Sequence, residues 1–490
     1  MHDEPLIFER GSRGRMAWEV AGGADAAVEL PPELRREDDL AGFPEVGELE
    51  VLRHFLRLSQ WNYSAATTMY PLGSCTMKYN PVVNEHVARL SGFASLHPLV
   101  PESMAQGAMA LLAELEDWLK AVSGLDAVAL QPAAGAQGEL LGMLLVRAYH
   151  VDRGSPRRRV LIPASAHGTN PASSALCGYG VTEVPVGERG TLEAERVAAV
   201  MSDDVAALMV TNPNTLGLFE DEIERVAAIV HERGGLVYMD GANMNALMGV
   251  ARPGDMGVDV MQFNLHKTFS TPHGGGGPGA GPVAVRATLA DYLPTPRLVR
   301  TKQGFRWDES AAKSVGRVRS FYGNFGILVR ALAYMLRLGG PGLRDVTRYA
   351  VLNANYIRAR LRGAYHLAYE TPSMHECVLS DRIQQGNGVQ TMDIAKRLLD
   401  YGFYAPTIYF PLVVKGALMI EPTETESRET LEEFITAMQA IADEARTQPE
   451  LVRAAPHTTR VGRLDETRAA RRPVLRWKPG AQPPAPAKEN

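Results

Sequence analysis

The chain has 490 residues, of which 45% are hydrophobic and only three are cysteines. Its 51 Lys and Arg residues nearly balance its 56 Asp and Glu residues, so the formal net charge is −5, with no long run of one sign. This length is enough for about two to four domains and a large buried core. The lack of a basic stripe disfavours a dedicated nucleic-acid binder.

The three cysteines, Cys75, Cys177 and Cys377, are far apart and form no CxxC pair. This spacing argues against a disulfide scaffold and a thiolate zinc site, and no metal site is expected. The first residues lack the basic and apolar regions of a signal peptide. Because no run of about 18 apolar residues could span a bilayer, we expect a soluble cytoplasmic protein that contacts neither membrane nor nucleic acid.

The middle of the chain alternates two periodicities. The apolar runs typical of buried strands are Ala127–Leu130, Val160–Ile162, Val205–Val210, Leu236–Met239, Val258–Phe263 and Pro282–Val285. Helical patterns between several of them occupy Glu139–His150, Leu192–Met201 and Glu220–Arg233. This order predicts an α/β fold with a mainly parallel, doubly wound sheet covered by helices on both faces. Ligands bind such sheets beyond the carboxyl ends of the strands.

The flanking regions follow other patterns. A long helical stretch to about Gly363, strand-like segments at His375–Leu379 and Leu418–Glu421, and a helix at Arg428–Arg446 indicate a smaller α+β domain. The predicted divisions are an N-terminal arm at 1–85, a large domain at 86–335, the smaller domain at 336–450 and an extended tail at 451–490. Within the tail, the proline-rich segment Lys478–Pro486 is expected to be extended or disordered.

Small residues fill the first loop of interest, Gln131–Glu139, between a predicted strand and a helix. Backbone N–H groups at such a helix start can bind phosphate. A tight turn that requires glycine would explain the same residues. The loop is neither a Walker loop nor a GxGxxG dinucleotide fingerprint.

Two charged residues also follow apolar runs. Asp240 could be a helix cap or loop anchor, or a carboxylate held at the sheet edge to pair with a buried cation. Lysines usually face solvent, but Lys267 follows a predicted buried strand, where desolvation beside other cations would lower its pKa and make it nucleophilic. The next segment, His273–Gly281, has six glycines in its last eight residues. We interpret it as a shaped wall of a site rather than a flexible linker.

A phosphate-binding turn, then an aspartate, then a lysine on one doubly wound sheet is the order that pyridoxal 5'-phosphate requires. The lysine forms a Schiff base with the cofactor. The aspartate keeps the pyridine nitrogen protonated, so that the ring can accept an electron pair. The sequence therefore predicts this cofactor.

Longer motifs carry a resemblance to the glycine cleavage system P-protein family, foremost Asn264–Gly279. Four further stretches agree with it: Tyr70–Pro81, Ala166–Ser173, Thr211–Gly217 and Ser320–Gly326. The match runs from about residue 50 to residue 430. At 490 residues the chain resembles the cofactor-bearing C-terminal half of the long single-chain form, which is a separate subunit in two-subunit versions.

The resemblance implies a fold-type-I, aminotransferase-like architecture and a reaction on glycine. Glycine would lose its carboxyl group as CO₂, and the aminomethyl group would pass to the oxidised lipoyl arm of the H-protein. The implied partners are a companion subunit 1, as a pair of heterodimers, and the lipoylated H-protein.

The resemblance also implies roles for single residues. Lys267 matches the Schiff-base lysine and Asp240 the partner of the ring nitrogen. His167 would stack on the ring, unless it is a helix-start histidine satisfied locally, and Ala242 would pack under the other face. The expected phosphate set is Ala134, Gly135, Ala136, Gln137 and His266, of which His266 could instead orient Lys267. Asn212 and Asn264 complete the expected cofactor-binding set.

The residues that bind glycine are harder to identify from the sequence. Ser74, Thr76, Lys78 and Asn212 are the candidates for binding the substrate. No arginine stands out as a clamp for the substrate carboxylate, and a tight salt bridge would oppose the loss of that group. Cys75 is interpreted as a packing residue.

Two alternatives remain open at this point. Another fold-type-I enzyme, such as a cysteine desulfurase, would need a cysteine on a mobile loop, and Cys377 lies in a strand-like segment. A non-catalytic structural subunit would have no need for an amine at Lys267 or a carboxylate at Asp240.

Overall fold

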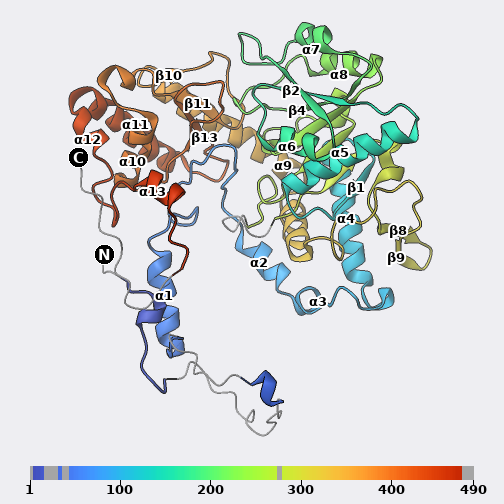
Figure 1. Cartoon of the computed structure of the whole chain (residues 1–490), viewed down its shortest axis with the longest axis horizontal. Coiled ribbons are helices and arrows are strands. Elements are labelled where there is room, and N and C mark those ends of the chain that lie inside the picture. The colour runs from blue at the N-terminus through green and yellow to red at the C-terminus, as the bar shows by residue number, and fades with distance from the viewer. Residues whose placement is uncertain (1–3, 16–30, 36–42, 273–278, 477–490) are drawn as a thin grey trace. The chain divides into compact units, whose positions relative to one another are not determined.

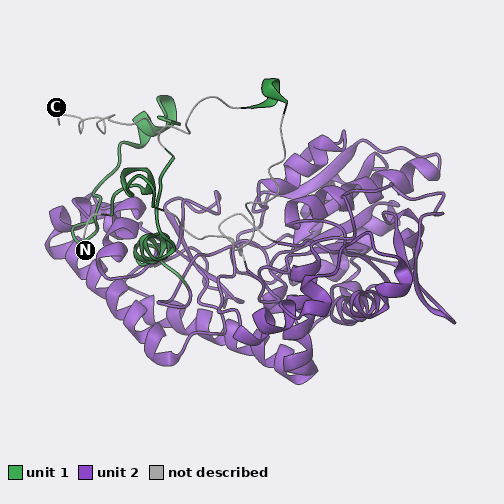
Figure 2. Cartoon of the chain, turned by 90° about the horizontal axis from the view of Figure 1, so that it is seen from below, with its two compact units in different colours: residues 1–64, 456–490 green, residues 65–455 purple. Residues whose placement is uncertain are grey.

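The computed structural model describes residues 4–15, 31–35, 43–272 and 279–476. The glycine-rich segment 273–278 and the proline-rich segment 478–486 lie outside the described residues, so the predictions made for them stay predictions. The chain divides into two compact units, residues 1–64 with 456–490, and residues 65–455 (Figure 2). No helix in the described ranges is both long enough and apolar enough to cross a membrane.

The larger unit is built on a seven-stranded sheet with the order β1-β7-β6-β5-β4-β2-β3 (Figure 1). Its strands are β1 (Ala127–Ala129), β2 (Arg159–Pro163), β3 (Gly180–Val184), β4 (Val205–Thr211), β5 (Leu236–Gly241), β6 (Val260–Phe263) and β7 (Val283–Val285). Strands β2 to β6 pair in parallel, and β7 runs antiparallel to both β1 and β6. The predicted mainly parallel sheet is confirmed. The edge strand β3 escaped prediction because most of its side chains are not buried.

Helices cover both faces of this sheet. They are α4 (Gln106–Ser123), α5 (Gly135–Asp152), α6 (Thr169–Leu176), α7 (Ala194–Val200) and α8 (Ile223–Glu232). Strand β5 shows why: Val237 and Met239 join the apolar core beneath α4 and α8, whereas Leu236 and Tyr238 join the core beneath α5. Because successive side chains of a strand point to opposite faces, a strand that is apolar throughout needs a helix on each side.

The same unit contains a smaller antiparallel sheet with the order β10-β11-β13-β12, whose buried side chains belong to a second hydrophobic core. Its strands are β10 (His366–Leu367), β11 (Cys377–Ser380), β12 (Thr407–Ile408) and β13 (Ala417–Ile420), and α10 (Thr391–Asp400), α11 (Arg428–Thr447) and α12 (Pro449–Arg453) accompany it. Helix α9 (Phe325–Leu361) joins the two sheets and is broken at Gly339, whose φ of 63° is not helical. The boundary predicted at 335–336 falls inside α9 and stays a prediction.

The segment before α2 (Val82–Ala88) belongs to the larger unit and connects its two sheets. Leu72 forms an isolated antiparallel bridge with Ile420 of β13, and Thr407 Oγ1 donates a hydrogen bond of 2.6 Å to the Gly73 carbonyl. Part of the sequence predicted as an N-terminal arm is therefore a strap held on the small sheet. This unit also contains α3 (Ser91–Ala94), the hairpin of β8 (Arg297–Thr301) and β9 (Gly304–Asp308), and several short 3-10 helices.

The smaller unit contains α1 (Glu48–Ser59) and α13 (Glu466–Arg471). Within this unit, the buried carboxylate of Glu4 accepts hydrogen bonds from His54 at 2.8 Å and Arg57 at 2.5 Å. The Arg57 guanidinium helps to lower the pKa of Glu4 to about 2. Helix α13 lies within the stretch predicted as an extended tail, so that expectation was wrong for residues 466–471.

Candidate active site

A cavity opens at the carboxyl ends of β4, β5 and β6, where the parallel sheet was expected to bind a ligand. Ten of the predicted site residues line it: Ser74, Ala134, Gly135, Ala136, His167, Asp240, Ala242, Asn264, His266 and Lys267. Glu139, Thr169, Thr211, Thr215 and Asn243 complete its lining. Gln137, Asn212, Thr76 and Lys78 do not line this cavity.

Lys267 follows β6 by four residues and is half-buried. Its Nζ donates a hydrogen bond of 2.7 Å to the backbone carbonyl of Ser74. Ser74 has a φ of 64°, a left-handed conformation that is unusual for a residue with a side chain. The structure therefore holds the amine on a backbone oxygen of the strap rather than on a carboxylate.

Asp240 lies near the end of β5 and is buried. The Ala242 N–H donates to its Oδ1 at 2.9 Å, and the amide of Gln262, its register partner on β6, donates to the same oxygen. Because both donors meet Oδ1, Oδ2 is the oxygen that a ligand can engage. A buried carboxylate with fixed donors suits pairing with a cationic N–H in the cavity.

The N-terminus of α5 also lines the cavity. The helix begins at Gly135, four residues before the predicted start, and its first intrahelical bond runs from the Gly138 N–H to the Ala134 carbonyl. The N–H groups of residues 135–137 precede that bond, so they have no acceptor within the helix and are placed to bind an anion. A Cβ on Gly135 would lie 2.4 Å from Asn264 Oδ1, so glycine is required at this point. Asn264 Oδ1 itself has no hydrogen-bond partner among the described residues.

His167 and Ala242 face the cavity from different elements. His167 precedes α6, its Nδ1 lies 2.9 Å from Thr169 Oγ1, and its ring meets Phe410 edge-on at 5.7 Å. Desolvation lowers the pKa of His167, although the negative charge of Asp240 opposes the shift. The lowered pKa favours the neutral form of this ring, which lines the cavity.

Two predicted cofactor residues have other partners in the structure. The Gln137 side chain accepts from the Ala133 N–H at 2.7 Å and donates to the Val318 carbonyl at 2.8 Å, which leaves only its backbone N–H for an anion. Asn212 is fully buried, and its Oδ1 accepts from the Glu220 N–H at 3.0 Å. These side chains shape the loops around the cavity.

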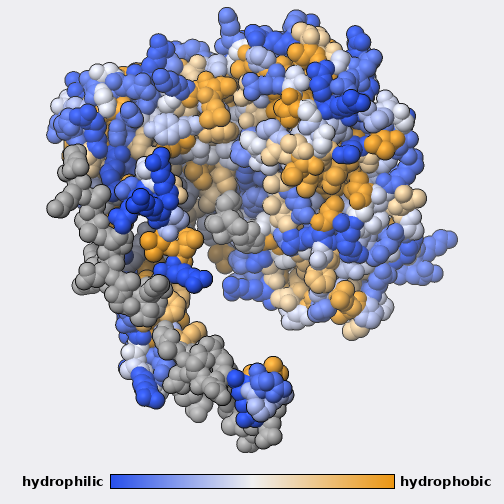
Figure 3. Space-filling view, in the orientation of Figure 1, coloured by the Kyte–Doolittle hydropathy of each residue, from blue (hydrophilic) through white to orange (hydrophobic). Residues whose placement is uncertain are grey.

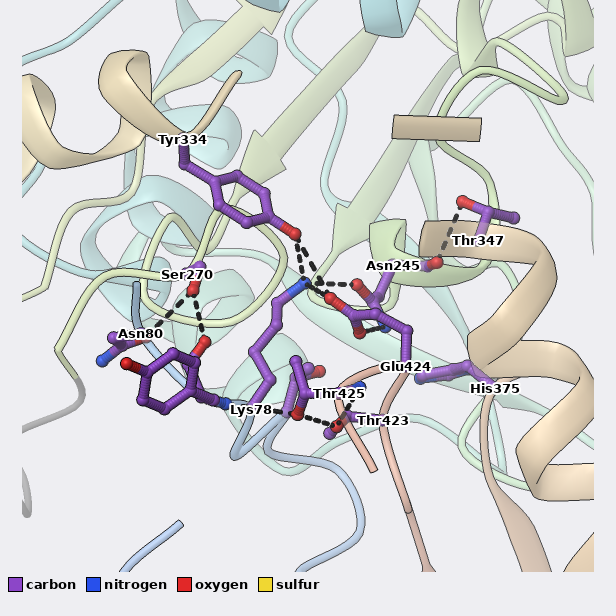
Figure 4. A network of polar contacts seen from close by, with 12 residues as sticks. Lys78, Asn80, Asn245, Ser270, Tyr334, Thr347, His375, Thr423, Glu424 and Thr425 are labelled. Carbon is purple, nitrogen blue, oxygen red and sulfur yellow. Dashed lines mark hydrogen bonds and ion pairs between the residues drawn. The ribbon is translucent and has the colours of Figure 1, made fainter. Parts of the chain in front are cut away.

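Lys78 lies in a separate polar network. Its buried Nζ contacts Glu424 at 2.7 Å, Asn245 at 2.9 Å and Tyr334 at 3.2 Å. Figure 4 shows these groups converging from different parts of the chain on the Lys78 amine. Since the amine already has three partners, its evident role is to join these segments. Thr76 likewise donates to Glu421 outside the cavity.

Sequence reasoning missed several buried titratable groups near Lys267. Glu139 lies one turn into α5, and burial together with the charge of Asp240 raises its pKa to about 9. His375, Glu376 and Glu421 form a second cluster, in which one polar atom of each lies within 4.8 Å of the others. Glu376 Oε2 accepts from the Ser74 N–H at 2.9 Å, which links this cluster to Lys267. The only sequence signal was a carboxylate next to an apolar run, as at Glu421.

Comparison with known proteins identifies the family to which the chain belongs. Residues 24–308 match the model of the glycine cleavage system P-protein, and residues 346–457 match that of the glycine dehydrogenase C-terminal domain. A probable glycine dehydrogenase (decarboxylating) subunit 2 from Exiguobacterium sibiricum is 53% identical over 482 residues, covering 97% of this chain and 98% of the relative. This chain belongs to the glycine cleavage system P-protein family. A relative of the same name from Pyrococcus abyssi is 51% identical over 483 residues, with 97% and 96% covered.

Solved structures agree on the fold of this P-protein family member. A glycine decarboxylase (P-protein) in inhibitor-bound form matches with a TM-score of 0.70 at 22% identity, covering 84% of this chain and 93% of that one. An aspartate aminotransferase from Thermus thermophilus matches with a TM-score of 0.57 at 15% identity, over 77% and 99%. A cysteine desulfurase from Escherichia coli matches with a TM-score of 0.59 at 14% identity, over 80% and 98%. The expected fold-type-I architecture is confirmed.

Proposed function

We propose that this chain is the pyridoxal-phosphate-binding subunit of a glycine dehydrogenase (decarboxylating). The observation that carries the proposal is the convergence of Lys267, Asp240 and the N-terminus of α5 on one cavity. An amine, a buried carboxylate and an anion site are the three groups that this cofactor needs. Membership of the P-protein family supports glycine as the substrate.

The cavity residues fit the cofactor by their chemistry. Asn264 Oδ1 is a buried acceptor without a partner among the described residues, and Gly135 leaves space where a side chain would collide. Lys267 would hold the cofactor covalently, Asp240 would hold a proton at the ring nitrogen, and the first N–H groups of α5 would bind the phosphate. When bound, pyridoxal phosphate supplies an electron-accepting ring.

The proposed reaction balances with the lipoyl arm as the acceptor. Glycine loses its carboxyl group as CO₂, and the electron pair of the broken C–C bond forms a new bond from the aminomethyl carbon to one lipoyl sulfur. The S–S bond of the oxidised lipoyl arm breaks, and the other sulfur takes up a proton. The neutral His167 ring and Ala242 would flank the cofactor in the cavity, and Asp240 would favour the form of the ring that accepts electrons.

Two protein partners belong to the proposal, a companion subunit 1 and a lipoylated H-protein. Residues 82–104 expose apolar side chains, among them Val82 at 57%, Leu99 at 69% and Met104 at 71%. Figure 3 shows further apolar side chains over the half of the molecule that carries the seven-stranded sheet. An exposed apolar surface of this kind is typical of a subunit interface.

A cysteine desulfurase is the less favoured alternative. That chemistry needs an accessible cysteine to accept the sulfur atom, and Cys377 is buried within β11. Burial raises the pKa of this thiol, which removes its nucleophilic form at neutral pH.

The test is glycine-dependent exchange of labelled bicarbonate into the glycine carboxyl group, with companion subunit and lipoylated H-protein present. Lys267→Ala should abolish exchange and the borohydride-trapped bond to the cofactor, with the fold intact, because one cavity side chain is lost. Lys302→Ala, which removes an exposed lysine of the β8–β9 hairpin, is the matched control and should remain active. Substantial exchange by folded Lys267→Ala protein would contradict the proposal.

A further inference from the structure

The strap that carries Ser74 is fixed to the small sheet at several successive residues. Leu72 bridges to Ile420, Gly73 accepts from Thr407, and Thr76 donates to Glu421. A Cβ on Gly73 would lie 2.2 Å from the Met419 side chain, so the strap lies tightly on β13. Glu376, which directly precedes β11, adds the contact to Ser74.

Both backbone polar groups of Ser74 have a side-chain partner, an acidic one for the N–H and a basic one for the carbonyl. Its N–H donates to Glu376 Oε2 at 2.9 Å, and its carbonyl accepts from Lys267 Nζ at 2.7 Å. A left-handed φ costs a residue with a Cβ about 1–2 kcal/mol, so it persists only where neighbouring groups enforce it. The Glu376 acceptor is such a group. Without it, Ser74 could return to a negative φ and turn its carbonyl away from the amine.

Glu376 is fully buried beside other titratable groups. His375 and Glu421 face it within the cluster, Cys377 follows it in the chain, and the charges of Lys267 and Lys78 act on the cluster. Burial raises the pKa of Glu376 to about 7 and that of Glu421 well above its usual range. Glu376 Oε1 and both His375 nitrogens have no hydrogen-bond partner among the described residues.

We infer that Glu376 is a positioning residue, which holds Ser74 so that its carbonyl receives the Lys267 amine whenever that amine is not bonded to the cofactor. The inference rests on the proposed function in one respect, because an incoming amino acid must displace the lysine from the cofactor. A displaced amine without a fixed acceptor could move toward Asp240 or Glu139, the acidic groups of the same cavity. The Ser74 carbonyl keeps it in place for its return.

The experiment measures Lys267 itself, in the full-length chain freed of cofactor and without glycine. The protein is acetylated with an amine-reactive ester from pH 6 to pH 10, and the extent of labelling at Lys267 is followed by peptide mass spectrometry. The midpoint of the pH profile reports the pKa of the amine, and the plateau rate reports its accessibility. Glu376→Met removes the acceptor at similar volume, Glu376→Gln keeps a carbonyl oxygen for the Ser74 N–H, and Glu421→Gln is the matched control in the same cluster.

Labelling at pH 7 should rise about tenfold in Glu376→Met, through a lower midpoint of the pH profile, because the ammonium form loses its acceptor. Glu376→Gln and Glu421→Gln should stay within about twofold of the natural chain. A change of plateau alone, or equal midpoint shifts in Glu376→Met and Glu376→Gln, would overturn the inference. So would a stoichiometric divalent ion in the natural chain that Glu376→Gln lacks, since the cluster would then be a metal site.

The two proposals fail separately. The labelling needs neither pyridoxal phosphate nor glycine, so a chain without the proposed activity can still show the predicted midpoints. A chain that exchanges bicarbonate normally but shows no midpoint shift in Glu376→Met would refute only the role of Glu376.

Discussion

At the scale of single residues, Asp240 and Lys267 depend on the groups around them. Asp240 is suited to hold a proton at a ring nitrogen because the Ala242 N–H and the Gln262 amide fix it from the protein side. Lys267 is suited to covalent chemistry because its described acceptor is a neutral carbonyl rather than a carboxylate. A tight ion pair would stabilise the ammonium form and suppress the nucleophile.

Asp240→Asn should keep the covalent bond between Lys267 and the cofactor but slow bicarbonate exchange at least about a hundredfold, a barrier increase of about 2.7 kcal/mol. A neutral amide does not hold the ring nitrogen protonated, so the ring becomes a weaker electron acceptor. The measurements are the exchange rate at saturating glycine and borohydride trapping. Near-normal exchange would move the role of ring partner to another residue.

At the scale of elements, the site depends on where β5 and β6 end and on where α5 begins. Parallel pairing of β5 and β6 sets Asp240 opposite Gln262 and directs the following loop to Lys267. The start of α5 meets Asn264 so closely that Gly135 has no room for a Cβ. A Cβ on Gly281 would likewise lie 2.0 Å from the Ala134 carbonyl oxygen. Gly281, the last glycine of the stretch His273–Gly281, therefore packs closely against the start of α5.

Gly135→Ala should destabilise the chain by about 1–3 kcal/mol and weaken binding of pyridoxal phosphate, because the added methyl group must displace Asn264 or the helix start. Gly107→Ala is the control, since Gly107 lies in the first turns of α4 with no atom within 4 Å of the added methyl group. It should be neutral or stabilise the chain by up to about 1 kcal/mol. Denaturant unfolding and a cofactor titration of both variants would show whether the close approach matters.

At the scale of the whole molecule, carboxyl groups with a raised pKa contribute to the pH dependence of stability. Burial raises the pKa of Glu116 to about 8 and that of Glu139 to about 9. Both therefore keep their protons in the folded chain under conditions in which the unfolded chain has lost them. Carboxyl groups with a lowered pKa, such as Glu85, are ionised in both states above pH 6 and add no slope there.

The melting temperature should therefore fall as pH rises from 6.5 to 9. In the unfolded chain these carboxyl groups have a pKa of 4.5, so the stabilisation that comes from their protonation in the folded chain decreases above that pH. It is fully lost above pH 8 to 9, where the folded groups also ionise. Each such group contributes a slope of up to about 1.4 kcal/mol per pH unit. Glu116→Gln should flatten the dependence between pH 6.5 and 8, as measured by thermal melts across that range. An unchanged slope in this variant would show that Glu116 is ionised in the folded chain.

The exposed apolar side chains of residues 82–104 bear on assembly at the same scale. We expect a stable complex with a companion subunit, as a pair of heterodimers, because covering this surface removes apolar area from water. Gel filtration of the chain alone and after co-expression with the companion subunit is the measurement. A monomeric chain that is fully active with glycine and lipoylated H-protein would contradict the two-subunit assembly.

The sequence alone determined the parts of this protein that depend on local pattern. Apolar runs separated by helical periodicity predict a doubly wound sheet, and a charged residue that soon follows such a run is expected at the ligand-binding edge of that sheet. Asp240 and Lys267 were therefore identifiable, and the long motifs added the ring-stacking role expected of His167. The helix start at Gly135 was placed within a few residues.

Only the tertiary structure decided which distant residues meet. Glu376 and Ser74 are 302 residues apart in sequence, and Lys78 and Glu424 are 346 apart. No periodicity links such positions, because their contact depends on how the strap packs between the two sheets. For the same reason the sequence could not tell that Lys78 has its partners outside the cavity, or that the Ser74 carbonyl rather than a side chain meets Lys267.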